Sequence, residues 1–287
     1  MTDFPRTVVG GVSMPRMIIG SNWFLGYSHC TPSKDKLIHE SFSDYRKLAD
    51  LLEVFMNAGV DAVIAFGRNE LLQAGVKEAE QRTRRKCIIV STPSLPHDRS
   101  TAANGFDMDV IREILDAEAA CGATFCMPHT STTDDLVDNC AREVRHMAPV
   151  FAEMRKRGLI PGLSTHLPQT IVFTDETGLD AETYICIYNS MGFLMPLEVD
   201  WTQRIIHNAK KPVMTIKPMA SGQVRPFQAF NFVWNTLRPQ DMVAVGCMTP
   251  DEAKEVVELS LSILENRKAD LQLQETRSKA TVKTRAG

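Results

Sequence analysis

Two histidines stand at the ends of apolar segments that are predicted to be neighbouring strands. His129 ends the run ATFCMPH (123–129), and His166 ends the run LIPGLSTH (159–166). Neighbouring strands lie about 4.8 Å apart, so both imidazoles could meet one substrate or one metal ion. Histidine is the side chain best suited to proton transfer near neutral pH. We therefore expect His129 and His166 to form a catalytic acid/base pair; the alternative is two unrelated histidines that bond to loop backbone.

Lys217 follows another apolar run, in the segment TIKPMASG (215–222). A lysine that is partly buried there could have a lowered pKa, polarise a carbonyl group, or hold a carboxylate or phosphate. We expect it to be the third catalytic residue; the alternative is a lysine paired with a carboxylate in the wall. A divalent metal at His129 and His166 would need a further ligand, for which the candidates are His29, His97 and Asp98.

Other polar and aromatic residues follow the remaining strand candidates and could orient a substrate. Tryptophan can stack on a sugar face, although it also caps protein cores, and a tyrosine at a strand end can equally be buried. The side chains that we expect to bind the substrate, which would be carbohydrate-like or polyol-like, are Asn22, Trp23, His29, Arg68, Tyr188 and Asn189.

Eight short apolar runs, separated by amphipathic stretches, would position these residues. They lie at 17–20, 60–66, 86–92, 123–129, 159–166, 183–189, 212–218 and 242–247. Most are continuously apolar, as parallel strands covered on both faces are. Eight strands with crossovers predict an α/β fold of the (β/α)8 TIM-barrel type. An open doubly wound sheet is the alternative, but no G-x-G-x-x-G follows the first strand. In a barrel the candidate residues would converge on the rim at the carboxyl ends of the strands.

The connections predict helices and one long loop. Apolar residues at helical spacing occur in the stretches 48–55, 137–151 and 253–264. Residues 21–42 form a connection far longer than the usual 2–6 residues, which predicts a lid over the catalytic rim; the alternative is a plug made by its aromatic side chains. We expect one barrel domain over residues 1–273 and a frayed tail over 274–287.

Composition excludes several classes of function. Of the 287 residues, 44% are hydrophobic and 23% are charged, which is ordinary for a globular protein. The net charge of −3 provides no attraction to nucleic acid or to an anionic membrane. No apolar run is long enough to span a bilayer, and no signal peptide is recognisable. We expect a cytoplasmic protein with a small-molecule substrate and neither a nucleic-acid nor a membrane partner; the oligomeric state is not indicated.

With these residues in view, the chain resembles the aldo-keto reductase superfamily over roughly residues 10–265. The order and spacing of several segments carry the resemblance, which implies a barrel and matches His129 to the catalytic histidine of the family. These segments are AGVDAVIAFGRNELLQAGVKEA (58–79), MPH (127–129), KRGLIPGLSTHLPQTI (156–171), YICIYNSMG (184–192), IKPMASGQV (216–224) and VAVGCMTPDEAKEVVE (243–258).

The catalytic pattern of the family is not retained. The family reduces carbonyls with an Asp, Tyr, Lys and His set, and the first three positions fall near Ile64, Phe66 and Thr92. A phenyl ring cannot donate a proton, and a threonine cannot lower the pKa of a neighbour by its charge. Where many members carry a basic residue for the 2′-phosphate of the nucleotide, this chain has 247–249, CMT. The resemblance therefore implies a divergent barrel in which NADP binding is not expected.

Three functions remain open. The leading expectation is a non-redox enzyme, a lyase or isomerase of carbohydrate metabolism that abstracts a proton beside a carbonyl group. The first alternative is an NAD(P)H-dependent aldo-keto reductase with altered catalytic residues. The second alternative is a non-catalytic barrel that binds a metabolite, because a fold alone does not establish an activity.

Overall fold

Eight parallel strand positions close into a barrel in the computed structural model, which describes residues 3–97, 105–272, 276 and 278–279. The sheet runs in the order β10-β11-β12-β13-β3-β4-β5-β6-β9. Its two end strands, β9 and β10, are separated only by Gly162 and are halves of one strand, so the sheet is closed. The strands are β3 (Met17–Gly20), β4 (Ala62–Ala65), β5 (Ile88–Ser91), β6 (Ala123–Cys126), β9 (Ile160–Pro161), β10 (Leu163–Thr165), β11 (Tyr184–Ile187), β12 (Val213–Ile216) and β13 (Met242–Val245).

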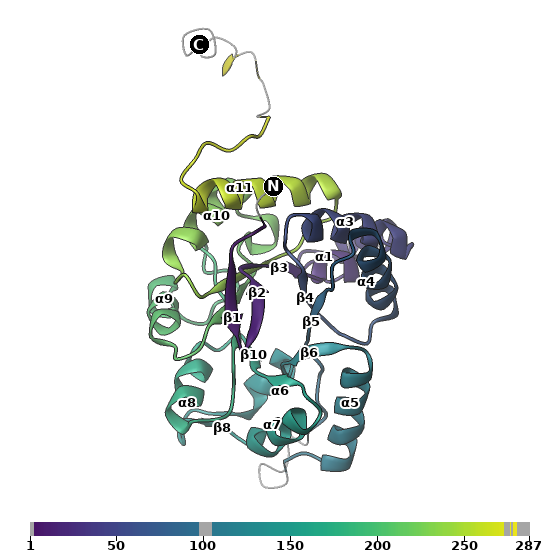
Figure 1. The fold of residues 1–287 in the computed structure, drawn as a ribbon. Coiled ribbons are helices and arrows are strands. Elements are labelled where there is room, and N and C mark those ends of the chain that lie inside the picture. Colours follow the sequence, from purple (N-terminus) through teal and green to yellow (C-terminus); the bar gives the residue numbers. More distant parts are fainter. Residues whose placement is uncertain (1–2, 98–104, 273–275, 277, 280–287) are drawn as a thin grey trace.

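Helices surround this barrel (Figure 1). Six of the described helices begin at a side chain that accepts a backbone N–H of the first turn, as Thr249 does from Glu252. The described helices are α1 (Asn22–Leu25), α2 (Pro32–Ser41), α3 (Tyr45–Asn57), α4 (Glu70–Thr83), α5 (Met108–Ala120), α6 (Thr130–Thr133), η1 (Asp134–Leu136), α7 (Met147–Lys156), α8 (Gln169–Thr177), α9 (Val199–Asn208), η2 (Ala220–Gly222), α10 (Pro226–Thr236) and α11 (Pro250–Leu264). None of the helices in these ranges is long and apolar enough to cross a membrane.

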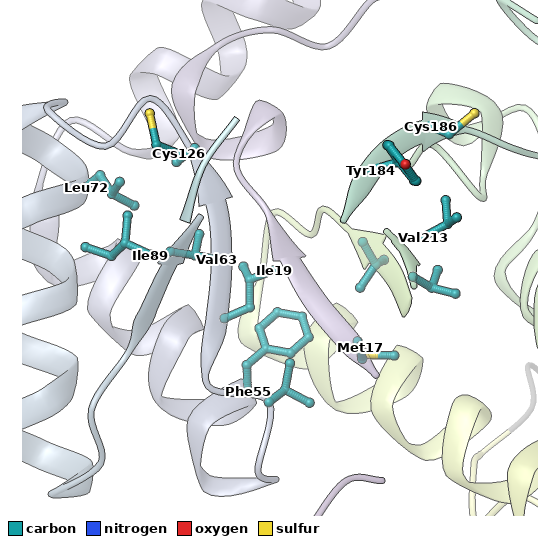
Figure 2. Packing of buried hydrophobic residues seen from close by; sticks show 14 of the residues in the cluster. Met17, Ile19, Phe55, Val63, Leu72, Ile89, Cys126, Tyr184, Cys186 and Val213 are labelled. Carbon is teal, nitrogen blue, oxygen red and sulfur yellow. The ribbon is translucent and has the colours of Figure 1, made fainter. Parts of the chain in front are cut away.

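The strands are apolar on both faces because each face packs against a separate core. Outward-facing residues such as Met17, Ile19 and Val63 pack against the helices, including Phe55 of α3 (Figure 2). Inward-facing residues fill the barrel, and the antiparallel hairpin of β1 (Arg6–Val9) and β2 (Val12–Pro15) adds Val9 and Met14 to this inner core. The hairpin directly precedes β3, so it covers the end of the barrel opposite the carboxyl ends of the strands.

The sequence-based prediction of an α/β TIM barrel is confirmed, and each of the eight predicted runs contains a strand. The prediction of a helix over 137–151 is wrong for the first half of this range. There, β7 (Val137–Asp138) and β8 (Glu143–Val144) form an antiparallel hairpin, and α7 begins only at Met147. The Asp138 carboxylate accepts the N–H groups of Cys140 and Ala141 at 2.9 Å each, which stabilises a turn instead of a helix.

The connection 21–42 contains helices α1 and α2 and is not an irregular loop. Several of its residues line the cavity at the carboxyl ends of the strands, and its role as a lid stays a prediction. The domain boundary at residue 273 stays a prediction. The predicted tail, 274–287, falls almost entirely outside the described residues.

Candidate active site

A cavity of about 560 Å³ opens at the carboxyl ends of the barrel strands. This volume is within the range of small-molecule sites in proteins. The cavity extends from the ends of β6 and β10 to the loops after β12 and β13 and to the N-terminal turns of α11. Six of the nine residues proposed from the sequence as catalytic or substrate-binding line it: Asn22, Trp23, His29, His129, His166 and Lys217.

His129 lies at the N-terminus of α6, shortly after β6, and one of its two ring nitrogens, Nδ1, is hydrogen-bonded. Its Nδ1 accepts the backbone N–H of Ser131 at 3.2 Å and lies 2.9 Å from the Ser131 hydroxyl. This hydrogen-bond pattern assigns the proton of the neutral ring to Nε2. Burial lowers the pKa of His129, partly offset by the negative charge of Asp134. Near neutral pH the ring is therefore uncharged and keeps Nε2–H as its free donor.

His166 follows β10 and is also neutral. Burial and then the positive charge of Lys217 lower the pKa of His166 to about 4. His129 adds a smaller lowering effect on the pKa of His166. The structure therefore brings the two predicted histidines to one cavity, as two uncharged imidazoles.

Asp134 connects the segments that carry these two histidines. Its carboxylate accepts the hydroxyl of Thr130, in the turn after β6, and the hydroxyl of Thr165, at the end of β10, at 2.5 Å each. It also accepts the backbone N–H of His166 at 3.1 Å. Asp134 was not among the site residues predicted from the sequence. The signal that could have found it is Thr165, a hydroxyl residue buried at the end of β10, because a buried hydroxyl needs a hydrogen-bond partner.

Lys217 lines the same cavity directly after β12. Burial lowers the pKa of its ammonium group to about 8. Within the described ranges no carboxylate lies within ion-pair distance of Lys217, so the alternative of a lysine paired in the wall does not apply. Its backbone has φ +61°, a left-handed conformation that costs a non-glycine residue about 1 kcal/mol or more. Such strain at a strand end is typical of functional positions.

The segment after β3 covers one side of the cavity. Asn22 Nδ2 and His29 Nε2 lie 3.0 Å apart, and burial lowers the pKa of His29. Trp23 packs against Gly246 at the end of β13, where any side chain would collide with the indole. The Lys34 ammonium lies 5.3 Å from the centre of the Trp23 ring. This segment thus places an aromatic surface and a cation over the cavity.

Arg68 does not line the cavity. Its Nε forms an ion pair at 2.9 Å with Glu118 of α5, whose side chain is 2% exposed. The same carboxylate accepts the hydroxyl of Ser91 at 2.5 Å. Ser91 in turn accepts the N–H of Gly67 at 3.1 Å. Arg68 therefore holds the turn after β4 against the outer face of the barrel.

Tyr188 and Asn189 also lie outside the cavity lining and are fully buried. The Tyr188 hydroxyl donates to Thr236 at 3.1 Å. The Asn189 amide bonds both N–H and C=O of Phe193, which closes the turn after β11. The structure thus gives these two residues packing and turn-forming roles in place of the substrate contacts that the sequence suggested.

The positions matched to the reductase tetrad do come together. Ile64, Phe66 and Thr92 line the cavity with His129, and the rings of Phe66 and His129 lie 5.5 Å apart. For a metal, the described part of the chain holds no group of three or more His, Cys, Asp or Glu side chains that could bind one. His97 faces Asp135 at 3.3 Å and does not line the cavity, and Asp98 lies outside the described residues.

Comparison with known proteins gives the fold. No family model and no curated protein matches the sequence. Among solved structures, a protein from Pseudomonas aeruginosa that is assigned as an aldo-keto reductase is 16% identical, with a TM-score of 0.64 and coverage of 92% of this chain and 98% of that chain. The chain has the aldo-keto reductase fold.

Two further solved structures are similar to this chain over most of their length. A protein assigned as 2,5-diketo-D-gluconic acid reductase B is 12% identical, with a TM-score of 0.58, and covers 96% of this chain and 95% of its own. The aldose reductase of Giardia lamblia is 11% identical, with a TM-score of 0.53, and covers 96% of this chain and 90% of its own. At identities this low, the structural similarity establishes the fold alone, and the activity has to be argued from the site.

Proposed function

We propose that this protein is an oxidoreductase that reduces a small carbonyl compound with a nicotinamide nucleotide. This is the first alternative raised by the sequence. The observation that carries it is the extent of the cavity. One continuous space joins His129 to the loop after β12 (217–226) and to the loop after β13 with the N-terminal turns of α11. These are the segments whose sequences resemble the reductases, so the resemblance and the cavity coincide.

The lining fits an extended, negatively charged nucleotide. Arg225 lies in the loop after β12 and, among the described residues, no carboxylate lies within ion-pair distance of it, so it is free to hold a phosphate. At the α11 end, the lining includes Glu252 and Glu255. A carboxylate suits a ribose 2′-hydroxyl and repels a 2′-phosphate. We therefore expect NADH to be preferred over NADPH.

The bound nucleotide would supply the hydride, and the chain would bind and protonate the substrate. The Nε2–H of His129 can donate a hydrogen bond to the carbonyl oxygen, which stabilises the negative charge that develops there. A neutral imidazole is a weak acid, so a second group has to supply the proton. Lys217, whose pKa of about 8 keeps it mostly protonated at pH 7, has that proton and lines the same cavity. Lys217 would thus take the place of the tyrosine of the reductases.

A second function, the lyase or isomerase reaction expected from the sequence, is favoured by one observation. His129 and His166 are both uncharged near neutral pH and line one cavity. The uncharged His166 ring can accept a proton from the carbon beside a carbonyl group, while the Nε2–H of His129 and Lys217 would stabilise the resulting enolate. A carbohydrate-like substrate would fit either reaction.

Nucleotide binding decides between the two functions. NADH and NADPH are titrated into the protein by fluorescence or calorimetry, followed by a panel of keto sugars, aldehydes and keto acids. Micromolar binding of NADH and its oxidation by one of the carbonyl compounds are expected. If neither nucleotide binds, and a carbonyl compound exchanges its α-hydrogen for deuterium in D₂O with the protein present, the reductase proposal falls and the non-redox function replaces it.

A further inference from the structure

We propose that the Lys217 amine forms a covalent iminium with a small keto acid in the cavity. This inference concerns a different activity from nicotinamide-dependent reduction and does not rest on it. Lys217 would act here as a nucleophile and electron sink, a role that neither the sequence pattern nor the comparisons assign to it.

The placement of Lys217 satisfies what an iminium-forming lysine needs. It stands at the carboxyl end of a barrel strand and lines a cavity large enough for a small molecule. In the described part of the chain, no side chain accepts a hydrogen bond from its amine and no carboxylate pairs with it. An amine without a carboxylate partner can approach an incoming carbonyl carbon without first breaking an ion pair. Many surface lysines of this chain lack that freedom, as Lys211 shows by pairing with Glu182 at 2.9 Å.

The protonation state supports this role. The nucleophile is the neutral amine, and the pKa of about 8 leaves roughly a tenth of Lys217 in that form at pH 7. An ordinary surface lysine, with a pKa near 10.4, has less than about a thousandth in that form. The cause of the shift is burial, because transfer of an ammonium group from water disfavours its charge.

The reaction balances without an added oxidant or reductant. The Lys217 nitrogen forms a bond to the carbonyl carbon, and the π electrons of the C=O bond move to the oxygen, which takes up a proton. The nitrogen loses a proton, the carbinolamine hydroxyl is protonated, and water leaves as the C=N⁺ bond forms. The net change is a protonated lysine plus a ketone giving a protonated imine plus water. The iminium can then lose an α-proton as the electron pair moves toward nitrogen.

Three imidazoles line the cavity around Lys217, and one of them can carry these protons. The positive charge of Lys217 lowers the pKa of His29, His129 and His166, so the ammonium group is within electrostatic range of all three rings. The neutral His166 ring, which has no hydrogen-bond partner among the described residues, can take the proton from the attacking nitrogen and return it to the leaving hydroxyl. It can also accept the α-proton of the iminium.

The cations of the cavity favour a substrate with a negative charge. Lys34 projects over the Trp23 ring at 5.3 Å and, within the described ranges, no carboxylate lies within ion-pair distance of it. Lys34 and Lys217 both line this cavity, so a carboxylate on the substrate would meet a cation there. We therefore expect a keto acid to react better than a neutral ketone of the same size.

Borohydride trapping tests the inference without any nucleotide. The full chain is incubated at pH 7.5 with pyruvate, or with hydroxyacetone as the uncharged comparison, and sodium cyanoborohydride is added. Hydride reduces an iminium to a stable secondary amine, which peptide mass spectrometry assigns to a residue. We expect labelling of Lys217 at least tenfold above that of any surface lysine, and pyruvate labelling above hydroxyacetone labelling.

Variants make the assignment specific. Lys217→Arg keeps a cation but removes the primary amine, and Lys217→Met gives an uncharged side chain of similar length. Neither variant should form the adduct. Lys36→Met removes an exposed lysine of α2 and should leave the Lys217 adduct unchanged. Labelling of wild-type lysines in proportion to their exposure would overturn the inference, even if a Lys217 variant failed to fold.

The two proposals fail separately. An adduct at Lys217 without NADH binding supports the iminium and removes the reductase. NADH oxidation without an adduct supports the reductase and removes the iminium.

Discussion

The Asp134 carboxylate accepts the backbone N–H of His166 at 3.1 Å while its other oxygen accepts the Thr165 hydroxyl. A third bond, from Thr130, ties the same carboxylate to the turn that begins at His129. One acidic side chain thus sets the spacing of two strand ends that are far apart in sequence. These hydrogen bonds fix the segments that carry the two histidines. The charge of Asp134 also raises the pKa of both histidines, which opposes the lowering effect of burial.

Replacement of this carboxylate by an amide tests its role. In Asp134→Asn, one acceptor oxygen is lost and the negative charge disappears, so the pKa of His129 and of His166 should fall further. The lost hydrogen bond should cost about 1 kcal/mol of unfolding free energy. NMR titration of the imidazole protons gives the pKa values, and urea denaturation gives the stability. Asp135→Asn is the matched control, and equal histidine pKa values in the two variants would refute the electrostatic role of Asp134.

His129 should be needed for turnover, and two substitutions separate its possible roles. His129→Ala should lower kcat by about 10²–10⁴-fold, the usual contribution of a group that transfers or donates a proton. His129→Gln keeps an N–H donor near Nε2 and should retain more activity if the ring only donates a hydrogen bond, as in the reductase proposal. If both variants lose activity equally, the ring transfers a proton, as in the non-redox reaction. His39→Gln, on exposed α2, is the control; a loss below about threefold in His129→Ala would exclude both roles.

Most of the barrel could be predicted from the sequence because its strands are apolar on both faces. Runs such as 183–189 and 242–247 have no other stable location than between a helix layer and a barrel core. The ends of these runs also identified the cavity residues, since parallel strands place their carboxyl ends on one rim. His129, His166 and Lys217 were found for this reason.

The remaining features depend on tertiary contacts that a pattern does not encode. The apolar spacing of 137–151 suited a helix, but Asp138 stabilises a turn there by accepting two N–H groups. Asn189 and Tyr188 follow a strand as cavity residues do, yet their partners, Phe193 and Thr236, fix them in the wall. Position along the strand was predictable, whereas the direction of a side chain at the strand end was not.

The stability of the protein should fall as the pH is lowered through the range in which His166 resists protonation. The pKa of His166 is about 4 in the folded protein and about 6.5 in an unfolded chain. Between these values the unfolded state binds more protons, so the unfolding free energy decreases as pH falls from about 6.5 to about 4. The neighbouring His129 and His29 act in the same direction because burial lowers their pKa values too.

Urea denaturation at several pH values across this window measures the effect. His166→Gln should flatten the dependence relative to the wild type, because an amide does not titrate. His207→Gln, whose exposed ring bonds to the backbone of Thr236, should leave the slope unchanged. Identical slopes in the wild type and His166→Gln would show that the pKa of His166 is not lowered.

The nucleotide proposal predicts a specific loss of affinity in Arg225→Ala. A charged hydrogen bond to a phosphate contributes about 1.5–3 kcal/mol, so the Kd for NADH should rise by about tenfold or more. Arg204→Ala removes an arginine that stacks on Trp201 of α9 and should leave the Kd unchanged. Calorimetry with both variants is the measurement. Equal affinities would remove Arg225 from the nucleotide site.

Arg68 has a structural role that its residue type and place in the sequence did not indicate. From the sequence it was a candidate to orient the substrate, but it pairs with the buried Glu118 at 2.9 Å. Arg68→Ala leaves that buried carboxylate with two uncharged partners, the Ser91 hydroxyl and the Cys121 thiol. It should cost about 1–3 kcal/mol of unfolding free energy, with KM unchanged. Adding Glu118→Gln should recover part of the loss, because a neutral amide needs no cation. A raised KM with unchanged urea denaturation would instead return Arg68 to the substrate site.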